Sequence, residues 1–88
     1  MADPLRLYGL NALVLSAGSG IGEAAARTLA KHGATVVAAD TINSGVDRHF
    51  KSVKGITGLV GNLLDPEKIP ALVQEALDQL DGLDIVVN

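Results

Sequence analysis

The sequence predicts an α/β fold built on a doubly wound parallel sheet of four strands in the order 3-2-1-4, with flanking helices. Three observations predict it: strand-like and helix-like segments alternate, their connections are short, and the strand-like segments are apolar at nearly every position. Continuous apolar runs are typical of parallel strands covered on both faces. Strands separated by helices pair in parallel through right-handed crossovers.

The four expected strands are short apolar runs over residues 11–15, 35–39, 56–60 and 83–87. In a doubly wound sheet the order 3-2-1-4 brings the fourth strand beside the first. We therefore expect a ligand crevice at the carboxyl ends of the first and fourth strands.

The first expected helix covers residues 20–32 and is followed by Gly33, which suits a left-handed cap. Its apolar or small residues recur at helical spacing. They are Ile21, Ala24, Ala25, Thr28 and Leu29.

The clearest apolar stripe predicts a helix over residues 66–80. Asp65 is a good N-cap and Pro66 suits the first helical position, while Pro70 is expected to move or tighten the true start. Between these two helices the pattern is weak, and it predicts at most a short helix around residues 46–51.

Composition limits the chain to one small domain over residues 1–88, with 48% hydrophobic residues and no cysteine for a disulfide. A net charge of −3 and single Tyr and Phe residues argue against nucleic-acid binding. The N-terminus has an acid where a signal peptide needs positive charge, and no apolar run reaches membrane-spanning length. We expect a cytoplasmic protein with no membrane partner and, because its two histidines lack spaced ligands, no metal site.

A glycine-rich turn joins the first strand to the first helix within the segment LVLSAGSGIG. Gly18, Gly20 and Gly22 would let the backbone approach an anion, and the helix that follows presents unpaired N–H groups to it. Ser16 and Ser19 add hydroxyl donors. The alternative is an ordinary glycine-rich turn in which both serines make local turn or cap hydrogen bonds.

Asp40 ends the second strand, 18 residues after Gly22. This is close to the spacing at which an acidic residue accepts hydrogen bonds from the adenosine ribose of a dinucleotide. A carboxylate there would repel a 2′-phosphate, which favours NAD over NADP. The alternative is a solvated aspartate at a strand end.

Four segments, residues 14–22, 36–40, 61–65 and 82–88, together resemble the N-terminal part of the short-chain dehydrogenase/reductase family. The resemblance begins at about residue 7 and covers only the cofactor-binding first part of a longer family domain. It implies a partial Rossmann-like, NAD(P)-binding domain.

Within this resemblance, Gly20 and Gly22 match the second and third glycines of the family's TGxxxGxG turn, whereas Leu15 and Ser16 stand where the family has threonine and its first glycine. Asn88 matches the first residue of the NNAG motif. Asn62 and Leu63 lie where the family often has an aspartate and an apolar residue, respectively, at the adenine site. The implied cofactor residues are Ser16, Gly18, Ser19, Gly20, Ile21, Gly22, Asp40, Asn62, Leu63 and Asn88.

The family's catalytic serine, tyrosine and lysine, with YxxxK as their core, lie downstream of NNAG and are not among these residues. Tyr8 is followed four positions on by Ala12, so it cannot supply the motif and is expected to pack at the entrance to the first strand. The resemblance implies an oxidoreductase that moves a hydride between nicotinamide and a carbonyl or alcohol, with this chain alone inactive.

Two other hypotheses stay open. The changes at Leu15 and Ser16 are compatible with a non-enzymatic nucleotide-binding or interaction module. In the other hypothesis the chain is a truncated product. Its fourth strand would then be an unpaired apolar edge, and because such an edge invites strand addition, we expect the chain to self-associate.

Overall fold

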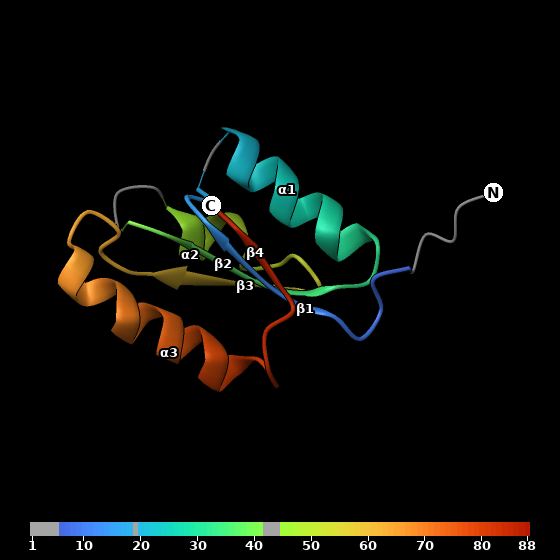
Figure 1. Ribbon diagram of the computed structural model, residues 1–88. Helices are drawn as coiled ribbons and strands as arrows, with labels where there is room; N and C mark the ends of the chain where they lie inside the picture. Colours follow the sequence, from blue (N-terminus) through green and yellow to red (C-terminus); the bar gives the residue numbers. More distant parts are fainter. Residues whose placement is uncertain (1–5, 19, 42–44) are drawn as a thin grey trace.

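The structure is a computed structural model that describes residues 6–18, 20–41 and 45–88. It contains a four-stranded parallel sheet in the order β3-β2-β1-β4 (Figure 1), which confirms the predicted topology. The strands are β1 (Asn11–Leu15), β2 (Thr35–Asp40), β3 (Ile56–Val60) and β4 (Ile85–Val87).

Strand β4 is shorter than expected because the residues before it anchor the strand rather than extend it. The Asp84 carboxylate accepts a hydrogen bond from the Asn11 backbone N–H at 2.8 Å, and the Asp84 N–H donates to the Asn11 carbonyl at 2.9 Å. These bonds set the start of β4 against the start of β1. Val86 on β4 is 56% exposed, and self-association through this strand stays a prediction.

Helices cover both faces of the sheet (Figure 1). Helix α1 (Gly20–Lys31) and the short α2 (Val46–His49) pack on one face, and α3 (Ile69–Gln79), preceded by the 3₁₀ helix η2 (Pro66–Lys68), packs on the other. No helix in the described ranges is long and apolar enough to cross a membrane.

The sheet divides the core into two apolar clusters because successive side chains of a strand point to opposite faces. The cluster under α1 and α2 includes Ala12, Val14, Val36, Ala38 and Phe50. The cluster under α3 includes Leu13, Val37, Ala39, Leu59 and Leu72.

Helix α1 forms where predicted, but part of its expected apolar set is exposed. Ile21 is 87% exposed, and Ala24 and Thr28 are exposed too. The rest of the set, Ala25 and Leu29, packs against the core as predicted, together with Ala30 and the fully buried Ala26. The left-handed cap is confirmed by Gly33, with a φ of +101°.

Tyr8 was expected to pack at the entrance to β1, and that expectation is wrong. Its side chain is 80% exposed. The Tyr8 backbone lies so close to Gly33 that a Cβ added there would be 3.0 Å from the Tyr8 nitrogen. Tyr8 therefore packs here through its backbone and not through its ring.

The Asp65 cap is confirmed, since its Oδ1 accepts a hydrogen bond from the Glu67 N–H at 3.0 Å. We expect Asp65→Ala to lower the free energy of unfolding by about 1 kcal/mol, because one N-terminal N–H group loses its acceptor. Urea denaturation measures this change. Asp78→Ala, which removes only an exposed bond to Gln74 within α3, is the control, and equal losses in the two variants would contradict the capping role.

Candidate functional site

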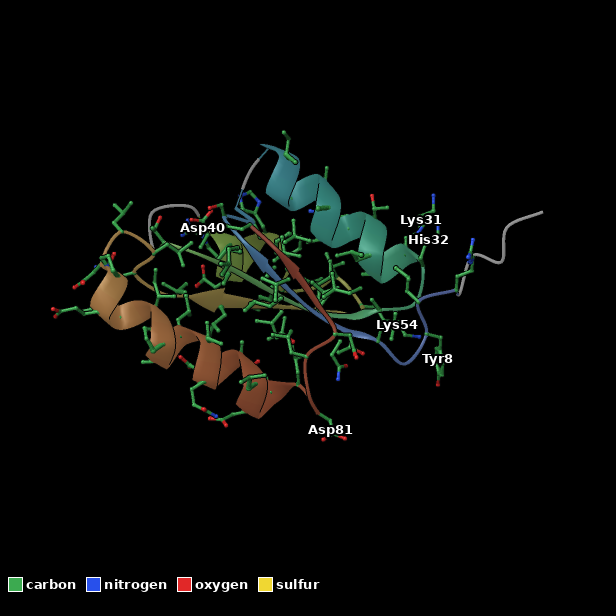
Figure 2. All side chains as sticks on the ribbon, in the orientation of Figure 1. Tyr8, Lys31, His32, Asp40, Lys54 and Asp81 are labelled. Atoms are coloured by element: carbon green, nitrogen blue, oxygen red, sulfur yellow. The ribbon has the colours of Figure 1, made fainter. Side chains whose placement is uncertain are left out.

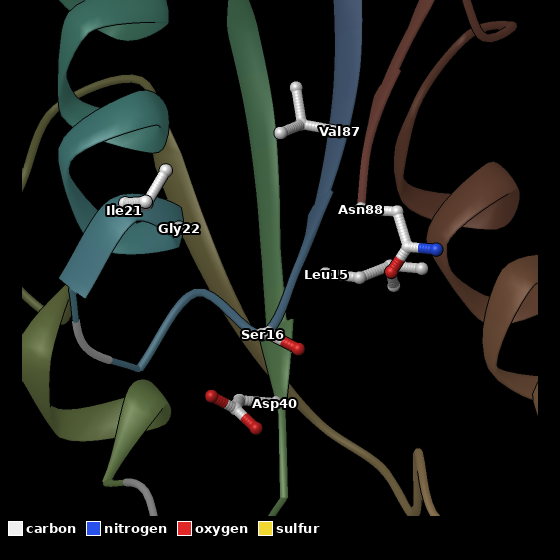
Figure 3. Close-up of a pocket in the computed structure, with 7 residues that line it drawn as sticks. All are labelled: Leu15, Ser16, Ile21, Gly22, Asp40, Val87 and Asn88. Carbon is white, nitrogen blue, oxygen red and sulfur yellow. The ribbon is translucent and has the colours of Figure 1, made fainter.

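A pocket of about 420 Å³ lies at the carboxyl ends of β1, β2 and β4, where the sequence predicted a crevice (Figure 3). Its volume is within the range of small-molecule sites, roughly 300–1,000 Å³. The lining residues come from three strand ends, the glycine-rich turn and the first turn of α1. They are Leu15, Ser16, Ile21, Gly22, Asp40, Val87 and Asn88.

Asp40, the last residue of β2, is half-buried and held by two backbone hydrogen bonds. Its Oδ2 accepts from the Gly18 N–H at 2.9 Å, and its Oδ1 accepts from the Thr41 N–H at 2.7 Å. A carboxylate offers about four acceptor positions, so both oxygens keep capacity for a ligand. The side chain thus ties the glycine-rich turn to the end of β2 and stays able to accept hydroxyl donors.

Ser16 directly follows β1 and has a left-handed backbone, with a φ of 57°. Its side chain is exposed and makes no hydrogen bond with any residue that the structure describes. The next residue, Ala17, donates its N–H to the Ala39 carbonyl at 3.1 Å, which keeps the turn on β2. Left-handed geometry at this position is what a glycine would adopt without steric conflict.

Two glycines shape the start of α1 in different ways. Gly20 has a φ of +62° and open space around it. Gly22 lies directly over the turn, and a Cβ built on it would overlap the Ser16 carbonyl oxygen and lie 2.8 Å from the carbonyl carbon. The absence of a side chain at Gly22 therefore lets α1 pack against the turn.

Of the predicted cofactor residues, five line the pocket: Ser16, Ile21, Gly22, Asp40 and Asn88. Gly18 does not line the pocket but is buried next to it, where its N–H donates a hydrogen bond to Asp40. Ser19 lies outside the described residues.

The predicted adenine-site residues do not line this pocket. The neighbouring Gly61 donates its N–H to the Asp40 carbonyl at 2.9 Å, which holds the segment to the same sheet edge. Asn62 is exposed, and its Oδ1 accepts from the Leu64 N–H at 3.0 Å, while Leu63 packs against the cluster under α3. A role of Asn62 and Leu63 at an adenine ring stays a prediction.

Two pocket residues were not among the predicted cofactor residues. Leu15 and Val87 are the last residues of β1 and β4, and they form an apolar part of the pocket wall. The predicted strand order could have identified both residues, because adjacent parallel strands end at the same edge of the sheet.

The described pocket wall carries one charged side chain. Asp40 is the only charged side chain among the seven lining residues. Across the described ranges, no group of three or more potential metal ligands occurs. The arrangement suits a neutral hydroxyl donor near Asp40, with phosphate oxygens near the glycine-rich turn and the start of α1.

Comparison with known proteins relates this geometry to one family. The model of the short chain dehydrogenase family matches residues 10–88. A 3-oxoacyl-(acyl-carrier-protein) reductase of Thermotoga maritima is 33% identical over 88 residues, which cover 96% of this chain and 36% of the relative.

Solved structures of the same kind superpose well. A 3-ketoacyl-(acyl-carrier-protein) reductase from Brucella melitensis complexed with NADH matches with a TM-score of 0.81 and 32% identity, over 91% of this chain and 33% of the other. A hydroxysteroid dehydrogenase from Escherichia coli matches with a TM-score of 0.82 and 32% identity, over 99% of this chain and 38% of the other. The chain spans about a third of the length of the curated relatives it matches.

Proposed function

Because this chain belongs to the short chain dehydrogenase family, we propose that residues 1–88 form a partial NAD-binding domain of an oxidoreductase. The observation that carries the proposal is the pocket in which the glycine-rich turn, Asp40 and Asn88 meet at the ends of the parallel strands. The NADH bound in the Brucella reductase supports a nicotinamide dinucleotide as the ligand class.

The residues present fit such a cofactor. The N–H groups in the first turn of α1 would hold the diphosphate, because the N-terminus of a helix presents unpaired backbone donors and a positive dipole end. The turn before it would shape the wall, since its Ala17 and Gly18 N–H groups already donate to Ala39 and Asp40. Asp40 would accept the ribose hydroxyls, and Leu15, Ile21 and Val87 would supply apolar wall. When bound, the nicotinamide would supply hydride transfer.

We propose that the complete protein transfers the hydride to or from a carbonyl or alcohol, with a serine, tyrosine and lysine from sequence outside these 88 residues. The isolated chain should then show no reductase activity. Carbonyl reduction by this chain that depends on Tyr8 would contradict this division of roles. An in-frame YxxxK in the coding sequence after Asn88 would support it.

NAD is expected to bind at least about tenfold more tightly than NADP, because the 2′-phosphate would approach the Asp40 carboxylate and none of the seven described lining residues is a cation. Titration calorimetry of the 88-residue chain with each dinucleotide measures both affinities. Equal affinities would contradict the NAD preference alone. No binding of either at millimolar concentration would contradict cofactor binding itself.

The departure from the family's turn at Leu15 and Ser16 favours a second candidate, a non-enzymatic nucleotide-binding or interaction module. Such a module would have no oxidoreductase activity, whether or not it binds a nucleotide. No NAD binding at millimolar concentration would remove cofactor binding from both candidates, and an in-frame continuation with NAG and then YxxxK would decide for the enzyme.

A further inference from the structure

We propose that the Ser16 side chain is a further contact of the dinucleotide site, where its hydroxyl donates a hydrogen bond to a ribose or phosphate oxygen. This inference rests on the proposed function. It assigns a ligand contact to the position at which the chain departs from the glycine of its family.

The position of Ser16 carries the first step. Ser16 lines the pocket, and Figure 3 draws it between Asp40 and Asn88. The hydroxyl is exposed and has no hydrogen-bond partner among the residues that the structure describes. It is therefore available to a molecule that enters the pocket.

The left-handed backbone conformation of Ser16 is the second part of the argument. A φ of 57° is disfavoured for any residue with a Cβ, and glycine relieves that conflict. Serine therefore destabilises this turn relative to glycine, and no hydrogen bond of its hydroxyl to a described residue offsets the loss. A ligand contact is the compensation that the geometry allows, since strained residues of this kind cluster at ligand sites.

The opposite effect would follow if the side chain only narrowed the site. Ser16 would then obstruct the cofactor, and removing its side chain would strengthen binding. The two explanations predict changes of opposite sign in affinity, so a single substitution separates them.

The experiment compares the 88-residue chain with its Ser16→Gly and Ser16→Ala variants, by calorimetry with NAD and by thermal unfolding. We expect Ser16→Gly to raise Tm by roughly 4 °C, because glycine relieves the left-handed strain. The same variant should bind NAD about three- to tenfold more weakly, because one hydrogen bond is lost. Ser16→Ala should lose the same affinity without the gain in Tm.

Ser52→Ala is the matched control, since Ser52 is exposed and lies outside the pocket lining. It should leave the NAD affinity unchanged. Adenosine and ADP, titrated in parallel, identify the acceptor. A loss of affinity already present with adenosine assigns a ribose oxygen, and a loss that requires ADP assigns a phosphate oxygen.

If the chain binds NAD and Ser16→Gly binds it equally well or more tightly, the role of Ser16 is overturned while the proposed function stands. If the unmodified chain and both variants all fail to bind NAD, ADP and adenosine, the proposed function fails, and the inference fails with it.

Discussion

Gly22→Ala is expected to destabilise the fold by about 3 kcal/mol and to abolish dinucleotide binding. The added Cβ would overlap the Ser16 carbonyl oxygen and approach the Ala17 Cα to 3.1 Å. Both neighbours are backbone, so relief requires α1 or the turn to move, and overpacking of this kind costs about 1–3 kcal/mol or more. Because the displaced turn forms the pocket wall, binding should be lost with stability.

The sign of this effect is informative. Gly22 lies inside α1, where alanine has a helix propensity about 1 kcal/mol better than glycine. A destabilised variant therefore cannot be explained by propensity and must report the close approach of helix and turn.

Gly20→Ala is the comparison variant, because Gly20 has a positive φ but open space around it. It should lose only about 1 kcal/mol, the cost of left-handed geometry for a residue with a Cβ. Urea denaturation gives both free energies of unfolding. A Gly22→Ala chain as stable as the unmodified one would refute the packing argument.

The strand order and the place of the pocket could be predicted because they depend on patterns that are strong and local. The runs over residues 11–15 and 35–39 are apolar on both faces of the sheet, and this alone favours parallel pairing. Once four such strands alternate with helices, the crossover rule leaves few topologies. The strand ends and the glycine-rich turn then had to meet at one edge.

The face that α1 turns to the sheet could be predicted only in part, since Ala25 and Leu29 pack against the core but other members of the predicted stripe are exposed. Between Gly20 and Lys31 the chain is rich in alanine, and alanine contributes little to a contrast between apolar and polar faces. Ile21, one of the two large apolar residues of that helix, is exposed because it lies on the first turn, beside the pocket. Tertiary packing, rather than periodicity, decided the orientation.

The two hydrogen bonds that the Asp40 carboxylate accepts from backbone N–H groups also could not be predicted from the sequence. Spacing predicted Asp40 as a ribose ligand, but the partners Gly18 and Thr41 are defined only by the path of the turn. The left-handed backbone of Ser16 has the same origin. A resemblance indicated that glycine is usual there, and only the structure showed that serine adopts the glycine conformation.

The bonds to Asp40 lead to the second large expected effect. Asp40→Ala should lower the free energy of unfolding by about 2–4 kcal/mol without any cofactor, because the N–H groups of Gly18 and Thr41 both lose a charged acceptor. Asp40→Asn should lose about half as much, since its single acceptor oxygen can serve only one of the two N–H groups.

The control for these variants is Asp81→Ala, because Asp81 is exposed and lies at the opposite end of the sheet from Asp40 (Figure 2). Urea denaturation should leave the stability of that chain within a few tenths of a kcal/mol of the original. An Asp40→Ala chain as stable as Asp81→Ala would refute the structural role of the carboxylate.

Cofactor preference then separates the charge of Asp40 from its hydrogen bonds. Asp40→Asn keeps the size of the side chain and removes the charge that repels a 2′-phosphate. Calorimetry should show the ratio of NAD to NADP affinity falling from about tenfold or more to near one, at a stability between those of the original chain and Asp40→Ala. A ratio that stays at tenfold in Asp40→Asn would show that the preference arises from the shape of the pocket and not from the carboxylate.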